Sequence, residues 1–181
     1  ANFWAHKNHE MLLTAFGMHA ARRPGSALKL VLTGAPGPRM EFLRGAALQM
    51  GLGARVVFAG FLPDPEFAAL MRSCLALMFP SLYEGFGMPV LEAMAAGKPV
   101  LCGNLTSLPE VAGEAALFFD PRKPAEIVAA IERLEGDPER ARALVERGRQ
   151  RVAGFGDAAA MAARYLEVFR DVVRSPAGFV P

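Results

Sequence analysis

Residues 80–97 contain the side chains whose types and spacing are best suited to chemistry. The segment reads PSLYEGFGMPVLEAMAAG. Pro89 favours the first turn of a helix, so we expect the backbone amides of residues 87–91 at an open helix N-terminus, which attracts an anion such as phosphate. Gly85 and Gly87 carry no side chain just before that helix, which permits positive φ and lets a ligand approach the backbone. The segment therefore predicts a phosphate-binding loop.

Two carboxylates flank this expected anion site. Glu84 lies in the loop, and Glu92 falls about one turn into the helix. They would repel a phosphate unless they accept hydrogen bonds from hydroxyl groups. That combination suits a nucleoside diphosphate-sugar, with phosphates on the amides, ribose hydroxyls on one acid and sugar hydroxyls on the other. A single glutamate there also compensates a helix dipole, and Gly-Phe-Gly is an ordinary turn, so these residues leave both interpretations open.

Length and composition indicate one globular domain, residues 1–181. The chain is 52% hydrophobic and 21% charged with a formal net charge of +2, which excludes disordered, collagen-like and coiled-coil proteins. The basic residues are scattered, so no nucleic-acid partner is expected. No apolar run approaches the length of a membrane span, and no signal-peptide pattern opens the chain. Cys74 and Cys102 are interpreted as buried thiols, and we expect a cytoplasmic protein.

Short apolar runs alternate with helical patterns along most of the chain. Strands are expected at 28–33, 55–59, 74–79, 99–102 and 116–119, and helices at 11–22, 40–50, 65–72, 89–96, from 109 onward and at 125–134. This order predicts an α/β fold, a Rossmann-like parallel sheet with helices on both faces. Ligands of such sheets bind at the carboxyl ends of the strands.

A helical C-terminal tail follows, with helices expected at 138–151 and 158–173 and no strand between them. Tyr165 and Phe169 belong to an apolar stripe at helical spacing that must pack against something. The sequence leaves open whether that is this domain's own sheet or another domain. Because the chain begins at Ala1 without a methionine and enters a helix at once, we expect a fragment of a longer protein.

Residues 84–100, EGFGMPVLEAMAAGKPV, resemble the E-x(7)-E signature of the retaining glycosyltransferases of GT-B architecture, the glycosyltransferase group 1 family. Both acids, both glycines, the proline and the closing A-x-G-x-P-V are in register. Further matches are Lys7-Asn8, residues 30–34, Gly60-Phe61-Leu62 and residues 108–111. The resemblance implies the C-terminal, donor-binding half of a two-domain enzyme, with the N-terminal acceptor domain absent and residues 153–174 forming the crossing C-terminal helix.

The resemblance also implies a role for each matching position. Glu84 and Lys7 are the implied catalytic residues: the acid lies beside the transferred sugar, and the lysine neutralises the diphosphate. Glu92 would accept hydrogen bonds from the donor ribose. The remaining implied donor-binding residues are Gly34, Phe61, Leu62, Gly85, Phe86, Gly87, Met88, Pro89, Val90 and Leu91. The family needs no metal or other cofactor in its active site, and His6 and His9 lack a third ligand that would make a metal site.

One departure from the family's sequence pattern bears on the identity of the sugar donor. The family places an arginine a few residues before the lysine, and residues 2–6 contain none. The sequence NFWAHKNH instead resembles a variant among mannosyltransferase-like members, so GDP-mannose is expected over a UDP-sugar. The implied reaction moves a hexose to a glycan or lipid-linked acceptor with retention, and a lipid-linked acceptor would bring the full enzyme to a membrane surface. The chain alone is expected to catalyse little or nothing.

Two alternatives belong to other classes. The first is a non-catalytic nucleotide-binding or interaction module of Rossmann-like fold, which would have no use for an acid such as Glu84 beside a sugar. The second is a response-regulator or flavodoxin-like domain, which would need an acidic pocket or a flavin loop. Asp64 and Asp120 stand beside prolines without such a grouping.

Overall fold

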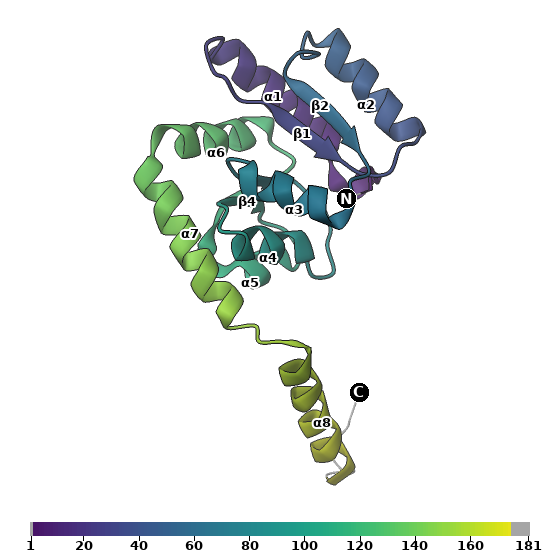
Figure 1. Ribbon diagram of the computed structural model, residues 1–181, viewed down its shortest axis with the longest axis vertical. Coiled ribbons are helices and arrows are strands. Elements are labelled where there is room, and N and C mark those ends of the chain that lie inside the picture. Colours follow the sequence, from purple (N-terminus) through teal and green to yellow (C-terminus); the bar gives the residue numbers. More distant parts are fainter. Residues whose placement is uncertain (1, 175–181) are drawn as a thin grey trace.

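We describe residues 2–174 of a computed structural model, in which strands and helices alternate as expected (Figure 1). The strands are β1 (Leu30–Thr33), β2 (Val56–Gly60), β3 (Leu77–Phe79), β4 (Val100–Gly103) and β5 (Ala116–Phe119). The first helices are η1 (Ala5–Lys7), α1 (His9–Arg22), α2 (Pro38–Gln49), α3 (Asp64–Ser73) and α4 (Met88–Ala95). The remaining helices are α5 (Leu108–Ala112), η2 (Gly113–Ala115), α6 (Pro124–Gly136), α7 (Pro138–Ala153) and α8 (Ala158–Arg174).

The third strand is shorter than expected. The prediction of a strand from Cys74 is wrong, because the Cys74 amide still donates to the Leu70 carbonyl and ends α3. Pairing begins only at Leu77, whose amide donates to Pro99. Cys74 is consequently only half-buried, whereas Cys102 in β4 is buried as expected. Burial raises the pKa of the Cys102 thiol to about 12, so this thiol is inert at neutral pH.

All strand pairs are parallel, and they form two sheets. β1 pairs with β2, and β3, β4 and β5 pair in that order. The β1 and β3 edges both line an apolar cavity of about 450 Å³, to which α1, α3 and α6 also contribute side chains. The α/β class and the parallel pairing are confirmed, with the difference that the described strands form two sheets and the cavity lies between β1 and β3.

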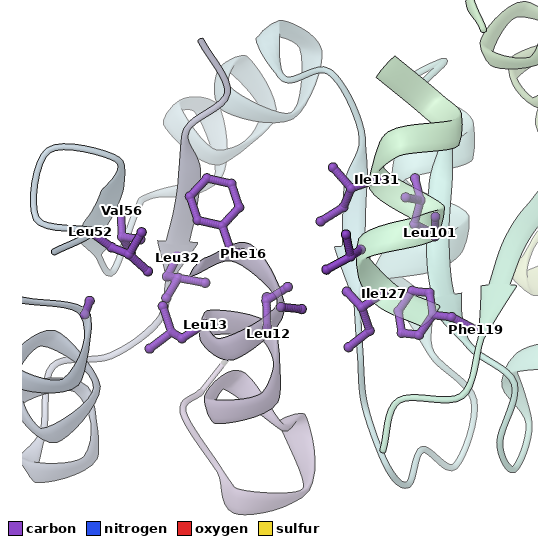
Figure 2. Packing of buried hydrophobic residues seen from close by; sticks show 14 of the residues in the cluster. Leu12, Leu13, Phe16, Leu32, Leu52, Val56, Leu101, Phe119, Ile127 and Ile131 are labelled. Atoms are coloured by element: carbon purple, nitrogen blue, oxygen red, sulfur yellow. The ribbon is translucent and has the colours of Figure 1, made fainter. Parts of the chain in front are cut away.

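Helices flank the strands on both faces, and β4 shows this most clearly. Leu101 belongs to a core cluster that also includes residues of α1, α2 and α6. Its neighbours Val100 and Cys102 belong to a second cluster with residues of α4 and α5. Because successive strand residues point to opposite faces, β4 is covered on both sides. In Figure 2, Leu12 of α1 and Ile127 of α6 face each other within the first cluster, and α1 packs against α6.

The last helix stands apart from this core. Figure 1 shows α8 extending away from the rest of the molecule, and no residue of it is buried. Its expected apolar stripe is present, with Tyr165 stacked on Phe169 and both exposed. The stripe therefore does not pack on the sheets of this chain. Among residues 2–174, no helix is both long enough and apolar enough to cross a bilayer.

Candidate active site

The loop between β3 and α4 is shaped by Gly87. This residue is the N-cap of α4 and has a φ of 95°, a conformation that side chains with a Cβ rarely adopt. A Cβ there would also lie 2.6 Å from Leu108 Cδ2. Gly87 therefore adopts the positive φ that glycine permits. Gly85 differs, because its φ is not positive and a Cβ there would meet open space.

Among the described residues, no side chain caps the N-terminus of α4. Pro89 occupies its first turn, as expected, and lacks an amide hydrogen. The expectation that the Val90 amide is open to a ligand is wrong, because this amide already donates to the Gly87 carbonyl at 2.9 Å. The positive end of the helix dipole still lies at Met88, a half-exposed residue, so this end of α4 can attract an anion.

Lys7 and Glu84 meet at this loop. The short helix η1 ends at Lys7, whose Nζ lies 2.5 Å from Glu84 Oε1. Each side chain is only 12% exposed, so the ion pair is largely shielded from water. The Lys7 ammonium also lies 5.3 Å from the centre of the Phe79 ring, within range of a cation–π interaction. The two residues with implied catalytic roles are thus in direct contact.

Asn8 fixes the position of Lys7, and sequence reasoning assigned it no role. It adopts a left-handed conformation with φ 59°, which asparagine tolerates better than most residues. Its side-chain amide donates to the Pro80 carbonyl at 3.2 Å and to the Pro121 carbonyl at 2.7 Å. The residue therefore ties the start of α1 to the loops after β3 and β5. The backbone adds one bond, from the Leu82 amide to the His6 carbonyl at 2.7 Å.

Asp120 stabilises the turn that contains Pro121, whose carbonyl accepts a hydrogen bond from Asn8. Its carboxylate accepts hydrogen bonds from the backbone amide of Arg122 at 3.0 Å and from its guanidinium at 2.8 Å and 2.9 Å. These bonds hold the pKa of Asp120 well below its usual range. This carboxylate is therefore committed to a local turn, which speaks against an acidic pocket of the response-regulator kind.

The other expected donor-binding residues lie on α4 and after β1 and β2. Glu92 is exposed on α4, and its carboxylate makes no hydrogen bond or ion pair within residues 2–174. Gly34 and Phe61 directly follow β1 and β2, and the Gly34 amide donates to the Gly60 carbonyl at 2.9 Å. Leu62 is half-buried, and Phe61 is exposed. Gly34, Phe61 and Leu62 follow the carboxyl ends of β1 and β2, and Glu84 lies in the loop after β3. Parallel α/β sheets bind ligands at the carboxyl ends of their strands.

Neither histidine near Lys7 joins a metal-binding group. His9 is buried with its ring 4.9 Å from that of Phe3, and burial together with the charges of Arg39 and Lys7 lowers its pKa to about 4. His6 lies against Trp4, with ring centres 5.6 Å apart. In the part of the chain that the structure describes, no three His, Cys, Asp or Glu residues gather as metal ligands.

The parallel strands and the helices on both of their faces define an α/β protein. Residues 1–151 match the family Glycosyl transferases group 1, and the chain belongs to that family. Its structural neighbours have the GT-B architecture. Sucrose-phosphate synthase from Thermosynechococcus elongatus superposes with a TM-score of 0.83 and 27% identity, over 97% of this chain and 44% of that one.

Two curated relatives are mannosyltransferases. O-antigen chain mannosyltransferase B of Escherichia coli is 47% identical over 74 residues, which is 41% of this chain and 19% of that protein. MMP alpha-(1->4)-mannosyltransferase of Mycolicibacterium hassiacum is 34% identical over 128 residues, 69% of this chain and 31% of that protein. The chain therefore spans less than a third of the length of either relative.

Proposed function

We propose that this chain is the donor-binding domain of a retaining glycosyltransferase that moves a hexose from a nucleoside diphosphate-sugar to a glycan or lipid-linked acceptor. The observation that carries the proposal is the contact between Lys7 and Glu84 beside the uncapped N-terminus of α4. A pure nucleotide-binding module could use Lys7 and the helix, but has no need of an acid such as Glu84 at that point.

The proposed roles follow from charge. As the bond from the anomeric carbon to the diphosphate breaks, negative charge develops on the leaving group and positive charge on the sugar. The Lys7 ammonium and the N-terminus of α4 stabilise the leaving diphosphate, and the Glu84 carboxylate lies beside the sugar. Glu92 accepts hydrogen bonds from the ribose, which suits its exposed and unpaired carboxylate. No metal takes part, because Lys7 and the helix supply the positive charge.

GDP-mannose is the proposed donor. The support comes from the sequence around Lys7, which resembles that of mannosyltransferase-like members, and from the mannosyltransferase names of both relatives. The family carries an arginine before the lysine, and residues 2–6 of this chain contain none. The positive charge here is that of Lys7, and the hydrogen bonds of Asn8 fix the backbone beside it.

The rest of the enzyme would complete the site. The exposed stripe of α8 offers an apolar face that a second, acceptor-binding domain of the same enzyme would cover. We place the enzyme in the cytoplasm, a reducing compartment that suits the free thiols Cys74 and Cys102, with peripheral membrane contact where the acceptor is lipid-linked.

Calorimetric titration of the chain with GDP-mannose, UDP-glucose and ADP-glucose tests the proposal. We expect GDP-mannose to bind most tightly and Lys7→Met to weaken that binding by about tenfold or more, because the diphosphate loses its charged partner. Lys29→Met is the matched control, since Lys29 lies before β1 and no role is proposed for it. Equal loss in both variants, or no binding at millimolar donor, would contradict the proposal.

A further inference from the structure

The segment after β4 holds the backbone of the Glu84 loop. The Glu84 amide donates to Thr106 Oγ1 at 3.1 Å. The Ser107 hydroxyl lies 3.0 Å from the Glu84 carbonyl and 3.2 Å from the Phe86 carbonyl, and its single hydrogen is shared between them. Both peptide groups of Glu84 are therefore bound by two adjacent hydroxyl side chains from another loop.

Thr106 makes its contact from a strained conformation. Its φ is 53°, in the left-handed region that β-branched residues rarely adopt. Such a conformation persists only where the surrounding structure over-determines it, and such residues concentrate at functional sites. The next residue but one, Leu108, also contacts the loop, because its side chain fills the space beside Gly87. Three successive side chains of this segment thus contact the loop that carries Glu84.

We propose that Thr106 and Ser107 are positioning residues for Glu84. They fix the backbone of Glu84 so that its carboxylate faces Lys7, at 2.5 Å, rather than the solvent. The inference rests on the proposed function, in which Glu84 lies beside the transferred sugar. Because Glu84 contacts the sugar and not the nucleotide, loosening its backbone weakens binding of a nucleotide sugar and does not weaken binding of the nucleoside diphosphate.

Thr106→Val and Thr106→Ser separate the hydroxyl from the shape of the side chain. We expect Thr106→Val to lower the affinity for GDP-mannose by about fivefold to tenfold while the affinity for GDP does not fall. Thr106→Ser keeps the hydroxyl and should bind both like the wild type. Thr14→Val is the matched control, since Thr14 Oγ1 donates to the Glu10 carbonyl at 3.0 Å on the exposed side of α1.

Hydrogen exchange at the Glu84 amide tests positioning without any ligand. This amide should exchange about tenfold faster in Thr106→Val and remain protected in Thr106→Ser and Thr14→Val. If the wild-type chain binds neither GDP nor GDP-mannose, the proposed function fails and amide exchange alone decides the positioning role. Ser107→Ala, which removes the second hydroxyl, replaces Thr106→Val if that variant does not fold. Unchanged exchange, or equal loss of GDP and GDP-mannose binding, overturns the inference.

Discussion

Lys7 and Glu84 are 77 residues apart in the chain, and their charged groups meet at 2.5 Å with each side chain 12% exposed. Little water screens this pair, so removing one partner leaves the other with an uncompensated charge. A bound diphosphate would offer the Lys7 ammonium a second anionic partner. Under the proposed function, a donor diphosphate would therefore compete with Glu84 for the Lys7 ammonium.

This competition predicts opposite effects for the two partners. Glu84→Gln should raise the affinity for GDP by about threefold to tenfold, because Lys7 no longer has to leave a carboxylate, whereas Lys7→Met should lower it. Calorimetry with GDP measures both. If Glu84→Gln weakens GDP binding as much as Lys7→Met does, the two residues do not compete in this way.

Replacing Asn8 by glycine measures what its two side-chain hydrogen bonds contribute to stability. Glycine accepts a φ of 59° without strain, so the loss of stability reports the bonds to Pro80 and Pro121. We expect the free energy of unfolding in urea to fall by about 1–3 kcal/mol. Asn104→Gly, at an exposed loop position, serves as control and should lose less than about 1 kcal/mol. Equal losses in the two variants would mean that the Asn8 side chain does not tie the loops together.

Gly87 and Gly85 provide a matched pair two residues apart. Gly87→Ala should destabilise the chain by about 1–3 kcal/mol, because the new methyl group meets Leu108 and the φ of 95° is strained. Gly85→Ala has neither problem and should change stability by less than about 0.5 kcal/mol. Thermal or urea unfolding distinguishes them, and similar losses would show that the tight packing at Gly87 is not required.

The lowered pKa of His9 predicts that the folded chain loses stability in mild acid. Its pKa is about 4 in the folded chain and 6.5 in the unfolded chain, so between these values the unfolded state binds more protons. The contribution is present above pH 6.5 and is lost as the pH falls toward 4. From pH 7 to pH 5 the free energy of unfolding should fall by up to about 2 kcal/mol more in the wild type than in His9→Gln. Parallel pH profiles would show that His9 is not held neutral by burial.

Most of the fold follows from periodicity in the sequence. The helices and strands lie within a few residues of their expected places because apolar runs and helical spacing depend on local sequence. Local sequence predicts the start of β3 too early, since the apolar residues after Cys74 suit a strand as well as a helix end. The separation of β1 from β3 depends on side-chain packing between distant segments, which no local pattern reveals.

The residues of the candidate site also fall into those that the local sequence indicates and those that only the fold reveals. Glu84, Gly87 and Glu92 could be singled out because they share one short segment with a spacing that has a physical meaning. Asn8 and Thr106 could not, because their importance lies in hydrogen bonds to loops far away in the chain. Polar residues in loops are common, and only the fold shows which of them face the backbone of the Glu84 loop.

The most direct test of the donor site is a calorimetric cycle that pairs Glu92 with the ribose. GDP and 2′,3′-dideoxy-GDP are titrated into the wild type, Glu92→Gln and the control Glu110→Gln, an exposed acid in the first turn of α5. Removing the ribose hydroxyls should weaken binding to the wild type and to Glu110→Gln by about tenfold, and should change binding to Glu92→Gln by less than about twofold. Absence of GDP binding, or equal losses in all three proteins, would contradict the assignment of this edge of the fold as a nucleotide-sugar site.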